Sequence, residues 1–101
     1  MAQVLVLYNA PTDPEAFHSY YENTHIPLAN KIPGLKSYTV SDGAVQAMAG
    51  SAAYLVAILT FDSMADLQAG LGSPEGQATA ADVQNFASGG ATIMVYESKA
   101  V

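Results

Sequence analysis

The sequence predicts an α+β fold in which two helices cover one face of a four-stranded antiparallel sheet, the ferredoxin-like βαββαβ arrangement. Short apolar runs, several rich in β-branched and aromatic residues, alternate with longer segments that carry helix-capping residues. Their order along the chain is strand, helix, strand, strand, helix, strand. A chain of 101 residues has a common size for one domain, so we expect residues 1–101 to form a single domain.

The first strand and the first helix have the clearest local signals. Residues 3–9 form an apolar run that ends before a proline, which predicts a strand. Thr12 or Asp13 can cap the following helix, and Pro14 suits its first turn. At about 100° per residue, five side chains share one face of this helix, which should therefore pack against something apolar. They are Phe17, Tyr20, Tyr21, Thr24 and Leu28.

We expect this helix to end at about His25, because Pro27 lacks a backbone donor and breaks helical geometry. On helical spacing His25 lies about 80° from Phe17, on the flank of the apolar face. One interpretation is a proton-transfer group beside a cleft between helix and sheet. The other is a histidine that hydrogen-bonds the last carbonyls of the helix.

The middle of the chain predicts two more strands and a partner surface. Residues 35–42 hold a plausible strand, and residues 43–50 are rich in Ala and Gly without a clear period. The run at 51–61 is apolar at consecutive positions, so we expect a strand buried on both faces. Helices cover only one face of such a sheet, and a second copy of the chain is the simplest cover for the other.

The second helix is predicted in two pieces. Ser63 caps a segment that Gly72 stops, and Ser73 followed by proline begins another that runs to about residue 87. Two glycines then precede the last strand, residues 91–97.

Composition excludes several classes of function. The net charge is −6, with three lysines and no arginine, which argues against nucleic acid and against anionic membranes as partners. No cysteine is present, so disulfides, thiolate nucleophiles and Cys-ligated metals are excluded. The apolar run at the N-terminus is too short for a signal peptide or a membrane span, and we expect a cytoplasmic protein.

One set of segments matches the pattern of a known family, and its members are residues 8–11 with Asp13, Phe17, residues 20–21, 25–28, 32–35, 61–63, 73–77, and Asp82 with Phe86. On these segments the chain resembles the EthD-type family, named for ethyl tert-butyl ether degradation, of the dimeric α+β barrel superfamily. The resemblance spans nearly the whole chain. It implies a homodimer whose two sheets form one barrel, with a cleft in each subunit between helices and sheet. Related barrels carry out different reactions, so the family does not fix one.

His25 is the candidate catalytic residue, and the resemblance identifies it as the histidine of a His-x-Pro-Leu motif. Tyrosines that line a cleft could stack on a flat ligand and orient its oxygens, and we choose Tyr21 and Tyr38 among the six. Phe17 and Asn9 complete the predicted ligand-binding set.

Two further groups receive structural interpretations. His18, Glu22 and His25 do not have the spacing of zinc enzymes, so we expect no metal site, and a His18–Glu22 pair on a solvated flank is the favoured interpretation. Asp82 is expected to be a surface charge or to pair with Lys31 or Lys36.

The predicted function is the handling of a small hydrophobic or aromatic metabolite in the cleft, without a cofactor. His25 would serve in isomerisation, cyclisation or dehydration by proton transfer. The alternative is a non-catalytic accessory or ligand-binding protein for an ether or xenobiotic degradation oxygenase system. Cofactor-free or haem-dependent oxygenation, as in related barrels, is a third interpretation.

Overall fold

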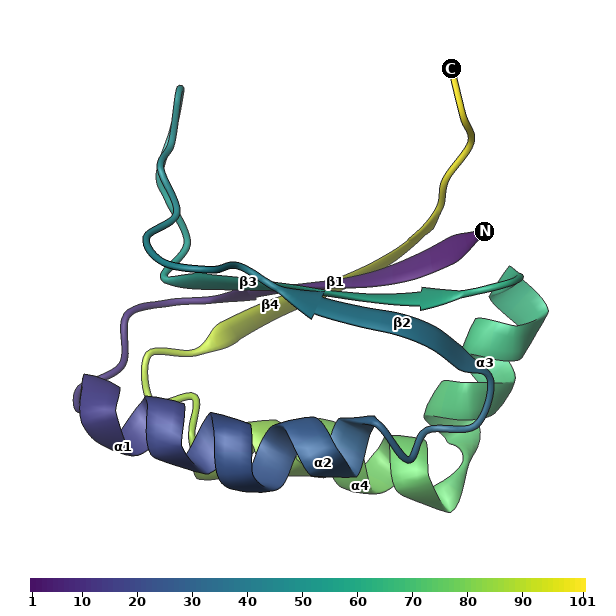
Figure 1. The fold of residues 1–101 in the computed structure, drawn as a ribbon, viewed down its shortest axis with the longest axis horizontal. Helices are drawn as coiled ribbons and strands as arrows, with labels where there is room; N and C mark the ends of the chain where they lie inside the picture. The colour runs from purple at the N-terminus through teal and green to yellow at the C-terminus, as the bar shows by residue number, and fades with distance from the viewer.

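Four strands form one antiparallel sheet in the order β2-β3-β1-β4. The computed structural model describes residues 1–101. The helical segments lie on one side of the sheet (Figure 1), which confirms the predicted ferredoxin-like fold. The strands are β1 (Ala2–Tyr8), β2 (Leu35–Val40), β3 (Leu55–Phe61) and β4 (Ala91–Glu97).

The two central strands alternate in burial. In β1, Val4, Val6 and Tyr8 face the helices and are buried. β3 has the same pattern, so Val56 and Ile58, on its other face, are only half-buried within one chain. The expectation of a strand buried on both faces is therefore not met by a single copy.

The first helical segment continues beyond Pro27, which corrects the predicted end at His25. It consists of α1 (Pro14–Tyr20), the π-helical turn η1 (Tyr21–His25) and α2 (Ile26–Ala29). Because α2 restarts after the wider π turn, Pro27 falls in its first turn, where the missing N–H is tolerated.

The π turn also changes which side chains are buried. Phe17, Tyr21, His25 and Ala29 form the buried stripe, at a constant spacing of four residues, while Thr24 is exposed. A π-helix bonds each residue to a more distant one than an α-helix does and so turns less per residue. The stripe therefore stays aligned, and His25 lies on the buried face rather than on its flank.

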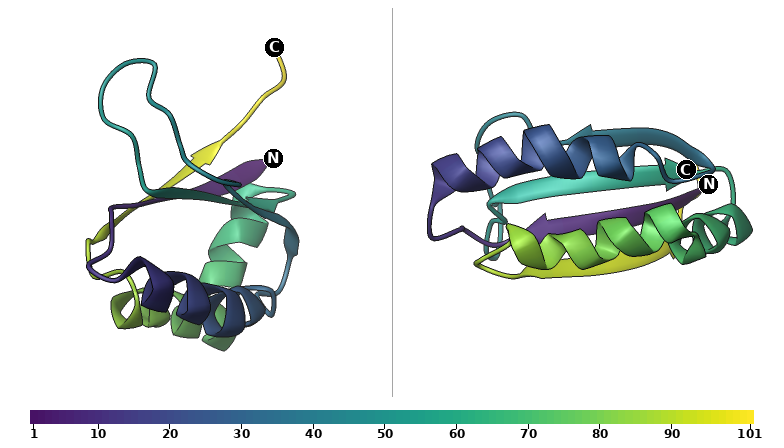
Figure 2. Two further views of the ribbon diagram at one scale, coloured as in Figure 1. Left: turned by 60° about the vertical axis from the view of Figure 1, so that its left-hand side comes forward. Right: turned by 90° about the horizontal axis from the view of Figure 1, so that it is seen from below.

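The second helical segment has the predicted break. It consists of α3 (Met64–Gly72), α4 (Pro74–Asp82) and the 3-10 turn η2 (Val83–Asn85). The Ser63 and Ser73 side chains accept hydrogen bonds from the backbone N–H groups of Asp66 and Gly76 and cap the two helices. Seen from the helical side, α4 and the α1–α2 segment run side by side across the sheet (Figure 2).

The other side of the sheet carries no helix. The connection between β2 and β3 and the C-terminal end of the chain both extend away on this side (Figures 1 and 2). No helix in the structure combines the length and the apolar character needed to cross a membrane.

Candidate functional site

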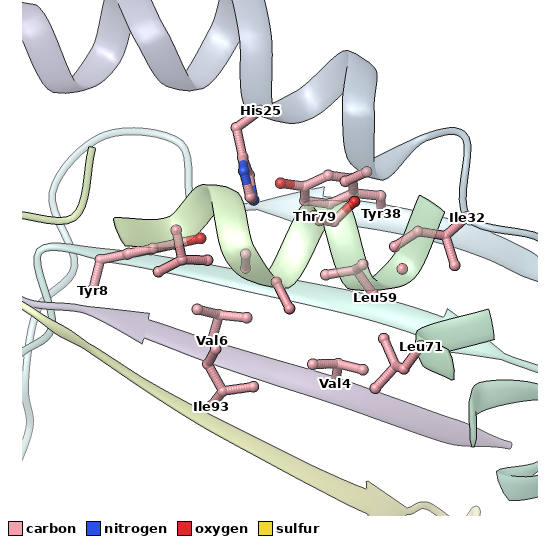
Figure 3. Close-up of a pocket in the computed structure, with 15 residues that line it drawn as sticks. Val4, Val6, Tyr8, His25, Ile32, Tyr38, Leu59, Leu71, Thr79 and Ile93 are labelled. Carbon is pink, nitrogen blue, oxygen red and sulfur yellow. The ribbon is translucent and has the colours of Figure 1, made fainter. Parts of the chain in front are cut away.

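A cavity of about 110 Å³ lies between the helices and the sheet. That is room for several water molecules or one small organic molecule. Twelve of its fifteen lining residues are hydrophobic, which favours an apolar occupant. The labelled lining residues in Figure 3 are Val4, Val6, Tyr8, His25, Ile32, Tyr38, Leu59, Leu71, Thr79 and Ile93.

His25 reaches the cavity from the π turn η1, with only 4% of its surface exposed. Its Nδ1 lies 2.9 Å from Oδ2 of Asp82, the last residue of α4. Nε2 has no hydrogen-bond partner within the chain, and the ring projects toward the cavity (Figure 3). The predicted catalytic candidate thus lines the cavity and has a carboxylate behind it.

Asp82 is buried rather than on the surface, which corrects the sequence-based expectation. Its carboxylate accepts hydrogen bonds from the Tyr20 hydroxyl at 2.6 Å, from Asn85 Nδ2 at 2.9 Å and from His25. Its expected partner Lys36 instead forms an exposed ion pair with Asp62 at 3.4 Å. Three donors satisfy the buried charge, as a buried carboxylate requires.

A sequence signal for Asp82 does exist. Thr79, Asp82 and Phe86 are spaced by three and four residues, so they share one helical face, and all three are buried. An acid on the packed face of a helix predicts a buried partner. That partner is 57 positions away in the chain, at His25, and no local spacing reveals it.

The environment holds His25 neutral near pH 7. Burial lowers the pKa of His25 below its ordinary value of 6.5, and the hydrogen bond and charge of Asp82 oppose this only in part. Burial acts to raise the pKa of Asp82, but the hydrogen bonds from Tyr20, Asn85 and His25 outweigh it and leave that pKa lowered. The Nδ1–H group of a neutral His25 donates a hydrogen bond to the ionised Asp82, which leaves the lone pair on Nε2 facing the cavity.

Two predicted ligand-binding tyrosines lie together, but only one lines the cavity. Tyr38 projects into the cavity from β2 (Figure 3), whereas Tyr21 lies behind the wall in the aromatic core. Their hydroxyl oxygens are 2.5 Å apart. Tyr8, which the sequence did not single out, also lines the cavity. Burial raises the pKa values of all three phenols, so they are hydroxyl donors at neutral pH.

The other two predicted ligand-binding residues lie outside the cavity lining. Phe17 is buried in the core and stacks on Tyr21, with ring centroids 5.7 Å apart. Asn9 is exposed, and its Nδ2 donates to the Gly89 carbonyl at 3.0 Å. Asn9 therefore fixes the turn before β4 in this structure.

His18 is paired differently from the expectation. Its Nε2 lies 2.7 Å from the Tyr54 hydroxyl, and no hydrogen bond joins it to Glu22. No group of three His, Cys, Asp or Glu side chains has a geometry that could hold a metal ion.

The comparisons with known proteins place the chain in a family. The model of the EthD domain matches residues 9–90. An uncharacterized 11.0 kDa protein in the thcB-thcC intergenic region of Rhodococcus erythropolis is 41% identical, over 100% of this chain and 98% of the relative.

Solved structures of similar proteins have the same fold. A crystal structure of an ethyl tert-butyl ether degradation (EthD) family protein from Bacillus halodurans has a TM-score of 0.87 at 35% identity, covering 98% of this chain and 99% of the other. A dimeric ferredoxin-like protein of unknown function from Thermobifida fusca has a TM-score of 0.68 at 17% identity, covering 94% and 88%, and shows the fold alone. The chain belongs to the EthD family.

Proposed function

We propose that this protein binds a small, mainly apolar molecule in the cavity and that His25 moves a proton on it without a cofactor. One observation carries the proposal. Nε2 of His25 faces an apolar cavity, while Nδ1 is held by a buried carboxylate. A base needs a free lone pair and a fixed orientation, and His25 has both. Burial also lowers its pKa below 6.5, which favours the unprotonated ring near neutral pH.

Asp82 supports this role in two ways. Its hydrogen bond selects the tautomer with the proton on Nδ1, so that Nε2 is the basic atom. Its negative charge also stabilises the imidazolium that forms when Nε2 takes a proton, and burial of both side chains shields the interaction from water. The proton can then return to another atom of the ligand, which is the pattern of isomerisation, cyclisation or dehydration.

Substitution of His25 tests the catalytic role. His25→Gln keeps a polar side chain of similar length but cannot take up a proton, and a well-placed general base contributes about 10²–10⁴-fold. With a compound that the protein converts, the turnover rate of His25→Gln should fall by that factor. The matched control is His18→Gln, because His18 is exposed and lies outside the cavity lining. Equal rates in the two variants would contradict the proposal.

The second candidate is an accessory protein that carries a ligand for an ether or xenobiotic degradation oxygenase system. The lining favours a carrier in one respect: twelve of its fifteen residues are hydrophobic, and such side chains can bind a ligand by packing but cannot react with it. A carrier returns its ligand unchanged. Mass spectrometry of a bound compound, recovered after hours at high protein concentration, separates the two: altered ligand supports proton transfer, and intact ligand supports the carrier.

We also propose that the protein is a homodimer that forms through the sheet face without helices. Leu5, Ile58 and Met94 lie in one row across this face, since Leu5 pairs with both of the others. Met94 is 43% exposed. Contiguous apolar surface of this kind is typical of a protein interface. The neighbour from Thermobifida fusca with the same fold is dimeric, which supports a dimer but not a particular interface.

Sedimentation tests the dimer. The wild-type protein should sediment at twice the chain mass of 10.5 kDa at micromolar concentration. Met94→Lys places a charge in the proposed interface and should shift the protein toward the monomer. Ser19→Lys, an exposed position on α1, adds the same charge elsewhere and should not. A wild-type monomer would overturn this part of the proposal.

A further inference from the structure

We infer that the site takes a neutral ketone or lactone with a hydrogen on the carbon beside its carbonyl, and that the Tyr38 hydroxyl holds the carbonyl oxygen while His25 removes that hydrogen. Such compounds are carbon acids, and their deprotonation gives an enolate. This inference rests on the proposed function, because it assigns a substrate class to the same base. It adds a second group, the phenol, and a reason why the ligand must carry an oxygen.

The base and the phenol lie at the same end of the cavity. The ring of Tyr21 stacks on the His25 ring, with centroids 5.3 Å apart and an interplanar angle of 25°. The hydroxyl of that same Tyr21 is 2.5 Å from the hydroxyl of Tyr38. Tyr21 thus connects the two groups from behind the wall. Figure 3 shows the Tyr38 ring beside His25, with both side chains projecting toward the cavity.

Counting protons shows that a donor is left for the ligand. Tyr21 and Tyr38 have two hydroxyl protons, and the bond between them uses one. If Tyr21 donates, the Tyr38 proton is free at the cavity wall. If Tyr38 donates, its proton is held by Tyr21, and the hydroxyl of Tyr8, which also lines the cavity, supplies the donor instead. Both arrangements leave one O–H at the cavity.

The effect of the shared hydrogen bond on the two phenols favours the first arrangement. That bond acts to lower the pKa of Tyr38, against the effect of burial, and to raise the pKa of Tyr21, as expected when Tyr21 donates and Tyr38 accepts. A hydroxyl that accepts a hydrogen bond becomes a stronger donor in turn, because hydrogen bonds in a chain polarise one another. Tyr38 is therefore the donor best suited to a developing oxyanion.

The remainder of the lining excludes charged ligands. It contains neither lysine nor arginine, so nothing there would neutralise a carboxylate or a phosphate. Apart from the phenols and His25, its only polar side chain is Thr79, whose hydroxyl donates to the Glu75 carbonyl within α4. A neutral, mainly apolar molecule with one hydrogen-bonding oxygen fits this distribution.

The proton balance needs no other reactant. The C–H bond beside the carbonyl breaks, its proton forms the Nε2–H bond of His25, and its electron pair forms a C=C bond. The carbonyl oxygen becomes an oxyanion that accepts the Tyr38 proton in a hydrogen bond. Return of the Nε2 proton to the same or another carbon restores the carbonyl and the neutral histidine, so the net change is exchange or isomerisation.

A matched pair of ligands tests this inference. 2-Tetralone is a small bicyclic ketone with acidic hydrogens at C1, and tetralin is the same ring system without the oxygen. NMR titration gives the dissociation constant of each, and the C1 signal of 2-tetralone in D₂O gives the exchange rate. The proteins compared are the wild type, Tyr38→Phe and Tyr54→Phe. Tyr54→Phe is the control, because it also removes one tyrosine hydroxyl, but from a residue outside the cavity lining.

The wild type and Tyr54→Phe should bind 2-tetralone about tenfold more tightly than tetralin, the effect of one net hydrogen bond, and Tyr38→Phe should bind both equally. Exchange at C1 should fall about 10²-fold or more in Tyr38→Phe, as for loss of one oxyanion donor. Equal binding of the two ligands by the wild type, or a preference that survives in Tyr38→Phe, would overturn the inference.

A fourth protein separates failure here from failure of the proposed function. If exchange is lost in His25→Gln while Tyr38→Phe keeps the wild-type ketone preference and exchange rate, the base stands and the phenol assignment fails. If His25→Gln exchanges C1 as fast as the wild type, the proposed base fails. A ketone preference lost only in Tyr38→Phe would then still support the phenol assignment.

Discussion

Two histidines lie seven residues apart on one helical segment, and the structure gives them different environments. His18 is exposed on α1, next to the Tyr54 hydroxyl. His25 is buried in the π turn, bonded to Asp82 and directed at the cavity. The residue type is the same, so the difference lies in burial and in the partner. A buried carboxylate and a local change of helix type convert a common surface residue into a candidate base.

The largest difference between the two sites should appear in stability. His25→Ala removes a buried ring and leaves Asp82 with two of its three donors, so the free energy of unfolding should fall by about 2–4 kcal/mol. His18→Ala removes an exposed ring and should cost less than about 1 kcal/mol. Denaturant unfolding of both variants gives the comparison. Similar losses in the two would contradict the burial contrast.

A smaller effect should separate the contributions to the pKa of His25. In a His18→Gln background His25 is the only histidine, and its ring protons can be titrated by NMR. The hydrogen bond and charge of Asp82 both raise the pKa of His25 against the effect of burial. Asp82→Asn should therefore lower that pKa further. A raised pKa in this variant would show that Asp82 does not stabilise the imidazolium.

The smallest effect should be the pH dependence of stability from His25 itself. Its pKa in the folded state is below the 6.5 of an exposed histidine, so the folded protein binds fewer protons than the unfolded chain between the two values. Stability should rise with pH across that window and should be fully gained above pH 6.5. His25→Gln should remove this part of the slope. A slope of the opposite sign in the wild type would mean that the charged form is favoured by folding.

The sequence predicts the helices and strands, and selects His25 as a candidate, because the signals for these features are local. Capping serines at 63 and 73, the proline after Ser73 and the apolar runs of the strands each act within a few residues. The resemblance to the family adds a cleft beside His25. Family and fold can therefore both be predicted from short segments of the chain and their order.

The partner of His25 and the course of its helix cannot be predicted in the same way. Helical spacing at about 100° per residue places His25 on a flank, and only the π turn rotates it onto the buried face. The bond to Asp82 joins two helices distant in sequence, so neither spacing nor capping reveals it. Tyr8 is missed because an inward-facing residue of a strand has the same pattern in a core as in a cavity wall.

The tautomer of His25 tests the central claim most directly. Long-range ¹H–¹⁵N correlation of the histidine ring at pH 7 reports which nitrogen carries the proton. In the His18→Gln background, we predict one neutral ring with its proton on Nδ1 and a lone pair on Nε2. A proton on Nε2, or a fully charged ring at that pH, would contradict the assignment of His25 as a base.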